Sequence, residues 1–509
     1  MALKLNRILV VGGGTAGWIA ATCLNECMRR AGAGAEVALL ESEAIGIIGT
    51  GEGSTPILRR FLDEFIGDED SFLRETGATF KLSVLFQGWQ KDKVYTNPFE
   101  SVNFDGLPPG SPVHFDYLRA ACVARGEDLG LALGFHPHLL RQNKAPMLQK
   151  GNEVERLGTY SYHFDGHSVG AWLSKRAQAE GVKRIEGKVV EVRKDESGNV
   201  ASLVLEDGRI ETADFFVDCS GFRRLLVGEA MGEPWIDYTP FLPVNSAIPF
   251  PVKRKDTDPI RSYTGATAMK AGWMWEIPLQ HRISQGYVFC DAFTTAEEAQ
   301  KEVEALLGHE IEPVRHIRFT TGRLRNMWVR NCVAIGLSSN FTEPLEATSI
   351  VFSFAQSVSL SSVLVEGLSD DSPVKRKYNA QIAEVCDGIR DFIALHYRTP
   401  RNDTPFWQAV NAEIKVPDSL AEKMDLWRQR MPQPGDEWAH MQIFGHAQDF
   451  YVGQGVGVLS PEVAQREMDF HGAWPLAEQI LGQIKGAVPQ MTGQAMDHRA
   501  YLERVNQAG

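Results

Sequence analysis

The segment RILVVGGGTAG, residues 7–17, determines the fold of the N-terminal part of the chain. Residues 7–11 predict a short apolar strand, and the glycines after them predict a tight turn. A helical stretch follows from Trp18 to Arg30, and a second strand covers Glu36 to Leu40. The order of strand, glycine turn, helix and strand is typical of the βαβ unit that binds a dinucleotide.

Each glycine of this turn has its own expected role. Gly12 permits the tight turn, Gly14 lets the backbone approach a pyrophosphate, and Gly17 lets the helix pack close to the strand. Thr15 and Ala16 stand at the helix N-terminus, whose amide hydrogens and partial positive charge favour phosphate. The turn therefore predicts a phosphate-binding site, although an ordinary glycine turn is the alternative.

Two further features near this unit point to a large cofactor. Glu41 lies 24 residues beyond Gly17, close to the place where a carboxylate holds ribose hydroxyls. The cluster GIIGTGEGST at residues 46–55 contains Gly49 and Gly51, and its amides can wrap a cofactor. A surface loop is an equally good interpretation of that cluster alone.

A third strand end carries Asp218-Cys219-Ser220-Gly221, and we place Ser220 near the same cofactor. The βαβ unit by itself does not distinguish FAD from NAD. Three glycine-bearing strand ends, widely separated in sequence, favour the longer FAD molecule.

Composition limits the classes of function. The chain has 509 residues, too many for one small core, so several modules are expected. Its 52 basic and 65 acidic side chains give a net charge of −13, which argues against a nucleic-acid partner. Gln356 and five serines interrupt the apolar run from Val351 to Leu368, so we predict no membrane span. Seven scattered cysteines predict free thiols in a reducing, cytoplasmic compartment, and the apolar start runs into the glycine turn without a signal peptide.

The motif Trp273-Met274-Trp275-Glu276-Ile277-Pro278 places two tryptophans on the same face of a strand. Core packing alone would explain such a pair. Together with the glycine turn, with residues 218–221 and with FTEPLEATSI at 341–350, however, the motif resembles the flavin-dependent tryptophan halogenases. The match extends through Arg390-Asp391-Phe392 and His396-Tyr397 to about Trp407.

The resemblance implies that reduced FAD, delivered by a separate flavin reductase, uses O2 to oxidise chloride or bromide to hypohalous acid. The acid then crosses a tunnel to a lysine beside an aromatic small-molecule substrate. Lys81, in ATFKL at 78–82, matches this lysine, and Glu346 matches the second catalytic residue. A lysine can hold the halogen by a hydrogen bond or as a haloamine, and a glutamate can polarise the acid or accept the ring proton. Without the resemblance, a solvated lysine and a first-turn helix acid would be the simpler interpretations.

The resemblance also implies roles for other residues. The amides of Thr348 and Ser349 match the halide site, and Trp273 and Trp275 keep substrate away from the flavin. The strand end Gly336-Leu337 is expected beside the flavin. Related FAD hydroxylases carry Gly-Asp there, so an NAD(P)H-fed aromatic hydroxylase is the rival enzyme class and a non-catalytic flavin-binding protein the second rival.

Three departures from the family pattern concern the halide and the substrate. Ala347-Thr348-Ser349 replaces Ser-Thr-Gly, which leaves the chloride or bromide preference open. Asn97-Pro98-Phe99 replaces His-Pro-Phe, and Phe99 can still stack on an indole. Residues 448–453, which include Phe450, show no obvious match to the tyrosine pair and acid with which the family grips the amino-acid end of tryptophan. We therefore predict indole, or a related electron-rich arene without that head, as the substrate.

These motifs give a predicted architecture. We expect an α/β chain with an FAD-binding, Rossmann-like module of the flavin monooxygenase type over residues 1–95 and 150–375. A largely helical substrate-binding module is expected over 96–149 and 376–509, with a loop-rich insertion at about 96–150. Pro344 predicts the first turn of a helix that runs to about Leu368. A homodimer is left open.

His163 and His167 lie four residues apart around Asp165 and could suggest a metal pair. No further ligand cluster accompanies them. We therefore predict a structural or pocket-lining role for His163 and no metal site.

Overall fold

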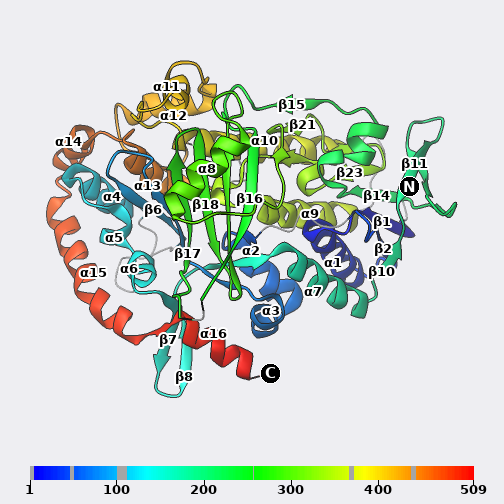
Figure 1. The fold of residues 1–509 in the computed structure, drawn as a ribbon, viewed down its shortest axis with the longest axis horizontal. Coiled ribbons are helices and arrows are strands. Elements are labelled where there is room, and N and C mark those ends of the chain that lie inside the picture. Colours follow the sequence, from blue (N-terminus) through cyan, green and yellow to red (C-terminus); the bar gives the residue numbers. More distant parts are fainter. Residues whose placement is uncertain are drawn as a thin grey trace. The chain divides into compact units, whose positions relative to one another are not determined.

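The computed structural model describes residues 5–45, 51–99, 112–255, 257–365, 372–436 and 443–508. The chain forms two compact units, each assembled from three separate stretches (Figure 1). Unit 1 comprises residues 1–77, 164–238 and 320–387, and unit 2 comprises residues 78–163, 239–319 and 388–509. The division into a cofactor module and a substrate module, with the boundaries given above, remains a prediction.

A six-stranded sheet lies at the centre of the described part of unit 1. Strand β1 (Arg7–Val11) lies between β2 (Glu36–Glu41) and β14 (Phe215–Asp218) and is parallel to both. A central strand of a parallel sheet is covered on both faces, which explains why this segment is apolar throughout. Strand β1 has the predicted range, β2 extends one residue beyond the predicted 36–40, and β14 ends at Asp218 as expected. The parallel arrangement confirms the predicted Rossmann-like sheet.

The two faces of β1 have different neighbours. Leu9 and Val11 point into a hydrophobic cluster that also contains side chains of the small sheet β11-β12-β13. Ile8 and Val10 are fully buried and point to the opposite face. Helix α1 (Thr15–Arg30) packs against β1 and β2, so the glycine turn between β1 and α1 is held from both sides.

Unit 1 contains further strands, helices and helical turns. They are β3 (Gly51–Gly53), α2 (Ile57–Phe61), a π-helical turn (Leu62–Ile66), α3 (Glu69–Thr76), α7 (Gly166–Ala179), β10 (Lys183–Glu186), β11 (Val189–Lys194), β12 (Val200–Leu205), β13 (Ile210–Glu211), helical turns Gly221–Arg223 and Leu225–Ala230, β15 (Trp235–Asp237), β21 (Gly322–Leu324), β22 (Trp328–Val329), β23 (Cys332–Ala334), β24 (Asn340–Phe341), 3-10 turns Gly336–Ser338 and Pro344–Glu346, α9 (Ser349–Val365) and α10 (Pro373–His396), which continues into unit 2.

The prediction that a helix begins at Pro344 is wrong. Pro344–Glu346 form a separate 3-10 turn, and helix α9 begins only at Ser349. Between them Ala347 has φ 54°, a left-handed conformation that cannot continue a right-handed helix. The expected end near Leu368 lies outside the described residues.

Unit 2 contains, within its described residues, a seven-stranded sheet in the order β20-β16-β19-β18-β17-β5-β6. Neighbouring strands are antiparallel, except that β5 (Ser83–Gln87) runs parallel to β17 (Tyr263–Met269). Met274 of β18 (Gly272–Pro278) belongs to a hydrophobic cluster under helix α8 (Ala296–Leu307). Because side chains alternate along a strand, the two tryptophans beside Met274 point to the other face.

The segment 96–150 was expected to be loop-rich. Its described part instead forms helices α4 (Pro112–Arg125), α5 (Leu129–Leu133) and α6 (His136–Arg141) before a strand. Proline and glycine here mark helix starts and ends, so their frequency misled the prediction.

The other elements of unit 2 are β4 (Thr79–Lys81), β6 (Val94–Pro98), β7 (Lys144–Lys150), β8 (Glu153–Arg156), β9 (Ser161–Asp165), which continues into unit 1, β16 (Ser246–Lys253), β19 (Arg282–Phe289), β20 (Ile317–Arg318), α11 (Pro405–Ala412), α12 (Asp418–Trp427), α13 (His446–Val456), α14 (Pro461–His471), α15 (Trp474–Gln494), β25 (Ala495–Asp497) and α16 (His498–Gln507).

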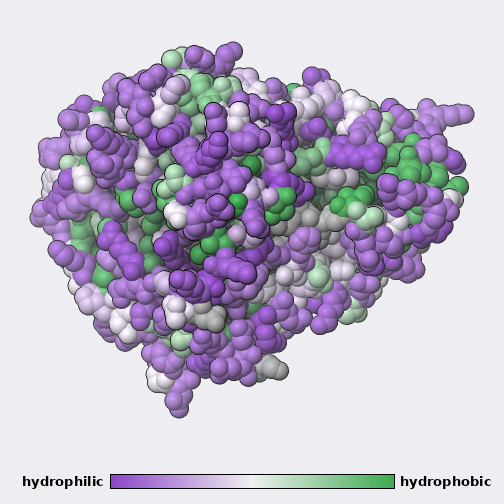
Figure 2. Space-filling view, viewed as in Figure 1, coloured by the Kyte–Doolittle hydropathy of each residue, from purple (hydrophilic) through white to green (hydrophobic). Residues whose placement is uncertain are grey.

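The surface in Figure 2 is largely hydrophilic, as the net charge leads us to expect. One small apolar group lies over β11, where Val190 is 53% exposed, and Ile210 of the same small sheet is 55% exposed. All seven cysteines lie in the described ranges and are free thiols. No helix in those ranges is both long and apolar enough to cross a bilayer.

Candidate functional site

The glycine turn of unit 1 combines close backbone contacts with open space at one glycine. Gly12 has φ 118°, and a Cβ atom on it would lie 2.2 Å from the carbonyl oxygen of Cys219. A Cβ atom on Gly17 would lie 1.9 Å from the carbonyl oxygen of Gly12, so this position requires close helix–strand packing. Gly14 faces open space and immediately precedes α1. No side chain caps this helix start, so the first amides of the helix, at Thr15 and Ala16, are directed at that space.

The predicted cofactor residues gather at one edge of the parallel sheet. The registers align Val11 with Asp218, and Asp218 with Ala334, at the carboxyl ends of β1, β14 and β23. Glu41 ends β2 at the same edge. The carboxyl edge of an open α/β sheet is where such folds bind ligands. Two of the three predicted glycine-bearing strand ends, those after β1 and β14, lie side by side at this edge, and residues 46–50 of the third lie outside the described residues.

Asp218 organises the turn that follows β14. It is fully buried and accepts hydrogen bonds from the backbone nitrogens of Leu226 (2.8 Å) and Val227 (3.0 Å). Its other oxygen accepts the Ser220 hydroxyl at 2.6 Å. The Ser220 oxygen in turn accepts the amide of Leu225 at 2.8 Å. The Ser220 hydroxyl therefore helps to hold the turn, and its cofactor role remains a prediction.

Gly336 and Leu337 begin the 3-10 turn after β23. The amide of Gly336 donates to Oε1 of Gln356 on α9 at 3.2 Å, and a Cβ atom on Gly336 would lie 2.7 Å from Cβ of Ala16. The turn therefore lies against the start of α1, beside the glycine cradle. Gln356 is fully buried and was seen in the sequence only as an interruption of an apolar run.

Glu346 lies in a tight turn that presents buried polar groups. Its side chain is fully buried, as is that of Glu343, and Thr348 is 3% exposed. Thr348 and Ser349 stand at the start of α9, where the first amides of a helix lack intrahelical acceptors and favour an anion. The left-handed Ala347 separates the carboxylate from these amides along the chain.

Lys81 is fully buried in unit 2 and ends the short strand β4. Its Nζ lies 5.0 Å from the centre of the Phe99 ring, so the structure brings these two predicted residues together. Asn97 of β6 is 1% exposed, and the amide of Phe99 donates to the carbonyl oxygen of Leu82 at 2.9 Å. A buried lysine beside an aromatic ring is a feature that sequence patterns alone do not reveal.

Two neutral imidazoles hold strand β4 in place. The hydroxyl of Thr79 donates to the carbonyl oxygen of Pro278 at 2.6 Å, so its oxygen accepts from Nδ1 of His163 at 3.2 Å. Nε2 of His163 then accepts from the hydroxyl of Thr264 at 2.9 Å. Burial, with the Lys81 charge as the next cause, holds the pKa of His163 well below its usual range. Both ring nitrogens are used, which supports the predicted structural role for this histidine.

His498 holds the residue next to Lys81. Its Nε2 accepts the backbone amide of Phe80 at 3.0 Å, and its Nδ1 donates to the carbonyl oxygen of Ile260 at 3.0 Å. Burial lowers the pKa of His498 to about 4. Protonation of Nε2 would remove the acceptor for the Phe80 amide. His498 lies far from β4 in sequence, so no local pattern could have indicated this contact.

This depressed pKa predicts a loss of stability in acid. The unfolded chain protonates His498 below about pH 6.5, while the folded chain resists protonation down to about pH 4. The folded state therefore binds fewer protons in that window, and its unfolding free energy falls by about 1.4 kcal/mol per pH unit as pH decreases. Urea titrations at about pH 7.5 and at about pH 5.0 measure this effect. The decrease in unfolding free energy between the two pH values should be about 2 kcal/mol larger in the wild type than in His498→Gln.

The exposed His309, which follows α8 in the same unit, provides a matched control. His309→Gln removes a surface imidazole and should keep the full acid sensitivity of the wild type. An identical pH dependence in wild type and His498→Gln would contradict the assignment of a neutral buried imidazole.

The tryptophan pair forms an aromatic wall on one face of the unit 2 sheet. Trp273 and Trp275 are 1% and 7% exposed, and their ring centres lie 6.4 Å apart at an angle of 61°. The Trp275 indole covers Gly286 of β19, where a Cβ atom would lie 2.1 Å from the ring. A larger residue at 286 would displace the indole, so the wall depends on that glycine.

Phe450 lies on α13, which packs against β6, the strand of Asn97. Its ring is fully buried, and the guanidinium carbon of Arg119 lies 5.9 Å from the ring centre. The adjacent Asp449 is 2% exposed and forms an ion pair with Lys423 at 2.6 Å. The acid of this segment is therefore already neutralised by a lysine of the same unit.

The second glycine cluster, residues 46–55, is described only in part. Gly49 lies outside the described residues, whereas Gly51 belongs to the short strand β3. The sequence interpretation passed over Glu52 in the same strand. Burial, together with the nearby carboxylate of Asp165, raises the pKa of Glu52 to about 7.

Comparison with known proteins assigns a family to this arrangement. The tryptophan halogenase family profile matches residues 7–469. Tryptophan 7-halogenase RebH of Lentzea aerocolonigenes is 37% identical over 522 residues, which cover 95% of this chain and 96% of RebH. The structure of tryptophan 6-halogenase SttH of Streptomyces toxytricini superposes with a TM-score of 0.87 at 30% identity, covering 98% and 100% of the two chains. Xcc4156, a flavin-dependent halogenase of Xanthomonas campestris, gives 0.85 at 33% identity over 98% of each chain.

The chain therefore belongs to the tryptophan halogenase family, an enzyme family that is flavin-dependent. Its cofactor is FAD, and a halide ion is its co-substrate. The residues present fit FAD, because the open space at Gly14, the uncapped start of α1 and the glycine-dependent close contacts form a cradle for a pyrophosphate.

Proposed function

We propose that this enzyme halogenates indole, or a related electron-rich arene without an amino-acid head, using chloride or bromide. Lys81 and Glu346 are the proposed catalytic residues. The proposal is carried by one observation, the fully buried Lys81 amino group 5.0 Å from the centre of the Phe99 ring. An ammonium in an apolar, aromatic setting suits a partner that is itself small, neutral and polarisable.

The overall reaction balances as FADH2 + O2 + halide + arene-H + H+ giving FAD + aryl halide + two water molecules. Bound FADH2, which we expect a separate flavin reductase to supply, provides the two electrons that allow O2 to oxidise halide to hypohalous acid. We propose that the cradle at Gly12, Gly14, Thr15, Ala16 and Gly17 holds the pyrophosphate. Glu41, Gly51, Ser220, Gly336 and Leu337 are proposed to line the rest of that cofactor site.

Halogen transfer follows from the chemistry of the two proposed catalytic groups. The Lys81 ammonium donates a hydrogen bond to the oxygen of hypohalous acid, which makes the halogen more electrophilic. The oxygen–halogen bond then breaks as a carbon–halogen bond forms at the ring. The ring regains aromaticity when its proton passes to the Glu346 carboxylate, and the released hydroxide is protonated to water.

The amides of Thr348 and Ser349 are the proposed halide donors, because first-turn amides bind anions. Trp273 and Trp275 are proposed to exclude the arene from the flavin, so that halide rather than the ring is oxidised first. Asn97, Phe99 and Phe450 are the proposed substrate contacts. Leu337 has no acidic group to offer where the related hydroxylases carry aspartate, which favours the halogenase over the hydroxylase.

Substrate choice gives the first test of this function. Tryptophan brings an ammonium and a carboxylate, and the one acid in the matching segment, Asp449, is already paired with Lys423. Each unpaired polar group costs about 1–3 kcal/mol, so kcat/KM for indole should exceed that for tryptophan by about tenfold or more. Mass spectrometry would quantify halogenated products from indole, 3-methylindole, tryptamine, indole-3-propionate and tryptophan, with chloride and bromide offered separately.

The panel separates the effect of each charge from that of size, because 3-methylindole adds bulk without charge. Preference for tryptophan over indole would refute the proposed substrate class and favour the substrate named for RebH and SttH. A parallel reaction without reductase should consume no NADH. Rapid NADH oxidation and a hydroxylated product would instead identify the hydroxylase.

A further inference from the structure

A cluster of three carboxylates surrounds one arginine at the edge of the unit 1 sheet. Glu41 on β2 stands directly opposite Glu186 on β10 in the parallel register, and Glu43 follows two residues later. Like charges on neighbouring strands repel. Arg184 offsets this repulsion, because its Nε donates to Oε1 of Glu41 at 2.6 Å and its Nη2 lies 2.9 Å from Glu43 and 3.0 Å from Glu186.

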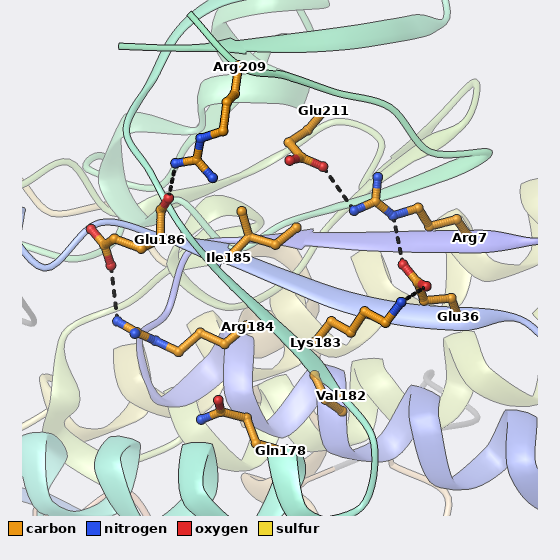
Figure 3. A pocket seen from close by; sticks show the side chains of 10 residues that line it. All are labelled: Arg7, Glu36, Gln178, Val182, Lys183, Arg184, Ile185, Glu186, Arg209 and Glu211. Carbon is orange, nitrogen blue, oxygen red and sulfur yellow. Dashed lines mark hydrogen bonds and ion pairs between the residues drawn. The ribbon is translucent and has the colours of Figure 1, made fainter. Parts of the chain in front are cut away.

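The arginine reaches this cluster from a specific face of β10. Figure 3 shows Arg184 directed to Glu186, while the neighbouring Lys183 leaves the strand toward Glu36. The Arg184 and Glu41 side chains are 27% and 18% exposed, so their ion pair is partly shielded from water. The hydrogen bond to Glu41 is the main reason that the pKa of Arg184 lies above its usual value. A charge-assisted bond of this length orients the carboxylate that it holds.

The second oxygen of Glu41 faces the glycine turn. A Cβ atom on Gly13 would lie 1.5 Å from Oε2 of Glu41, so any larger residue at position 13 would displace the carboxylate. The carboxylate is therefore held at Oε1 by Arg184 and presents Oε2 over the backbone of the cradle. Gly13 was passed over in the sequence because it is not one of the three glycines of the fingerprint.

We propose that Arg184 is a positioning residue that holds Glu41 ready for the ribose hydroxyls of the adenosine half of FAD, and that this pair selects FAD over a flavin without adenosine. The inference rests on the proposed role of Glu41 in the cofactor site. One arginine against three carboxylates leaves a net charge of −2 at the cluster. This negative charge favours hydrogen bonds from the ribose hydroxyls, whereas it repels the phosphate group of a phosphorylated ribose.

Calorimetric titration of the full chain with FAD and with FMN tests the proposal. Arg184→Gln and Glu41→Gln should each weaken FAD binding about tenfold and change FMN binding less than about twofold. The double variant should bind FAD as Glu41→Gln does, within about twofold, because Arg184 acts through Glu41. Arg184→Lys keeps the charge without the planar fork and should recover part of the loss.

Lys183→Met is the matched control, because it removes one positive charge from the same strand on the side of Glu36. Its FAD affinity should stay within about twofold of the wild type. The proposal is overturned if Arg184→Gln behaves like Lys183→Met, if FAD and FMN weaken equally, or if the effects at 184 and 41 are additive. Failure of the proposed function is separable, since it would leave FAD selection intact in an enzyme that forms no halogenated arene.

Discussion

Replacing Lys81 by methionine is expected to reduce the rate of halogenation by about 10³-fold while FAD affinity stays within about twofold. Methionine is unbranched and of similar length, so it fills the buried space of Lys81 without leaving a cavity. It also removes the cost of burying a charge, and therefore should not unfold the protein. What is lost is the nitrogen that we propose holds hypohalous acid.

The measurement combines two readouts on the same preparation. Halogenated indole is quantified by mass spectrometry, and FAD binding by calorimetry. Lys150→Met, on a half-exposed lysine of the same unit, should retain wild-type activity. Activity in Lys81→Met within tenfold of the wild type would show that Lys81 is not catalytic, whereas loss of FAD binding together with activity would make its role structural.

Replacing Glu346 by glutamine is expected to lower kcat by about 10²-fold, the usual contribution of a general base. Glutamine keeps the size and the hydrogen-bonding ability of the buried side chain but cannot accept the ring proton. Proton loss should then limit the rate. A ring-deuterated indole should therefore react more slowly than the ordinary compound in the variant, while the wild type shows little isotope effect.

Glu343→Gln is the control for this prediction, because Glu343 is an equally buried carboxylate three residues earlier in the same turn region. It should retain most of the activity and show no added isotope effect. Equal losses in the two variants, without an isotope effect, would indicate that Glu346 only supports the turn. An unchanged kcat in Glu346→Gln would remove it from the mechanism.

Much of unit 1 could be predicted because its signals are local. The strands at residues 7–11 and 215–218 and the helix after the glycine turn follow from short apolar runs and from where glycine occurs. The convergence of strand ends followed from the same pattern, since parallel strands present their carboxyl ends at one edge. Lys81 and Glu346 were proposed on a different basis, resemblance to a family, because neither carries a local signal of its own.

Predictions from local signals were wrong at two places. One contains a residue in a left-handed backbone conformation, and the other is rich in proline and glycine. Pro344 is a good helix start, yet the left-handed Ala347 delays α9 to Ser349 and places Glu346 in a separate turn. Proline and glycine between residues 112 and 141 suggested loops but delimit three helices. Neither the strain at Ala347 nor the helix boundaries can be derived from residue type alone.

The amino-acid sequence by itself determined the parallel sheet with its dinucleotide cradle, the tryptophan pair on one strand face, and the family. The sheet and the tryptophan pair depend on spacing along the chain, which short-range periodicity records. The family was inferred from the resemblance of motifs. Only the tertiary structure decided that Lys81 is buried beside Phe99, that His498 holds the strand of Lys81, and that Arg184 holds Glu41. These contacts join residues that are distant in sequence. Their energy comes from burial and charge at a shared location, which exists only after the chain has folded.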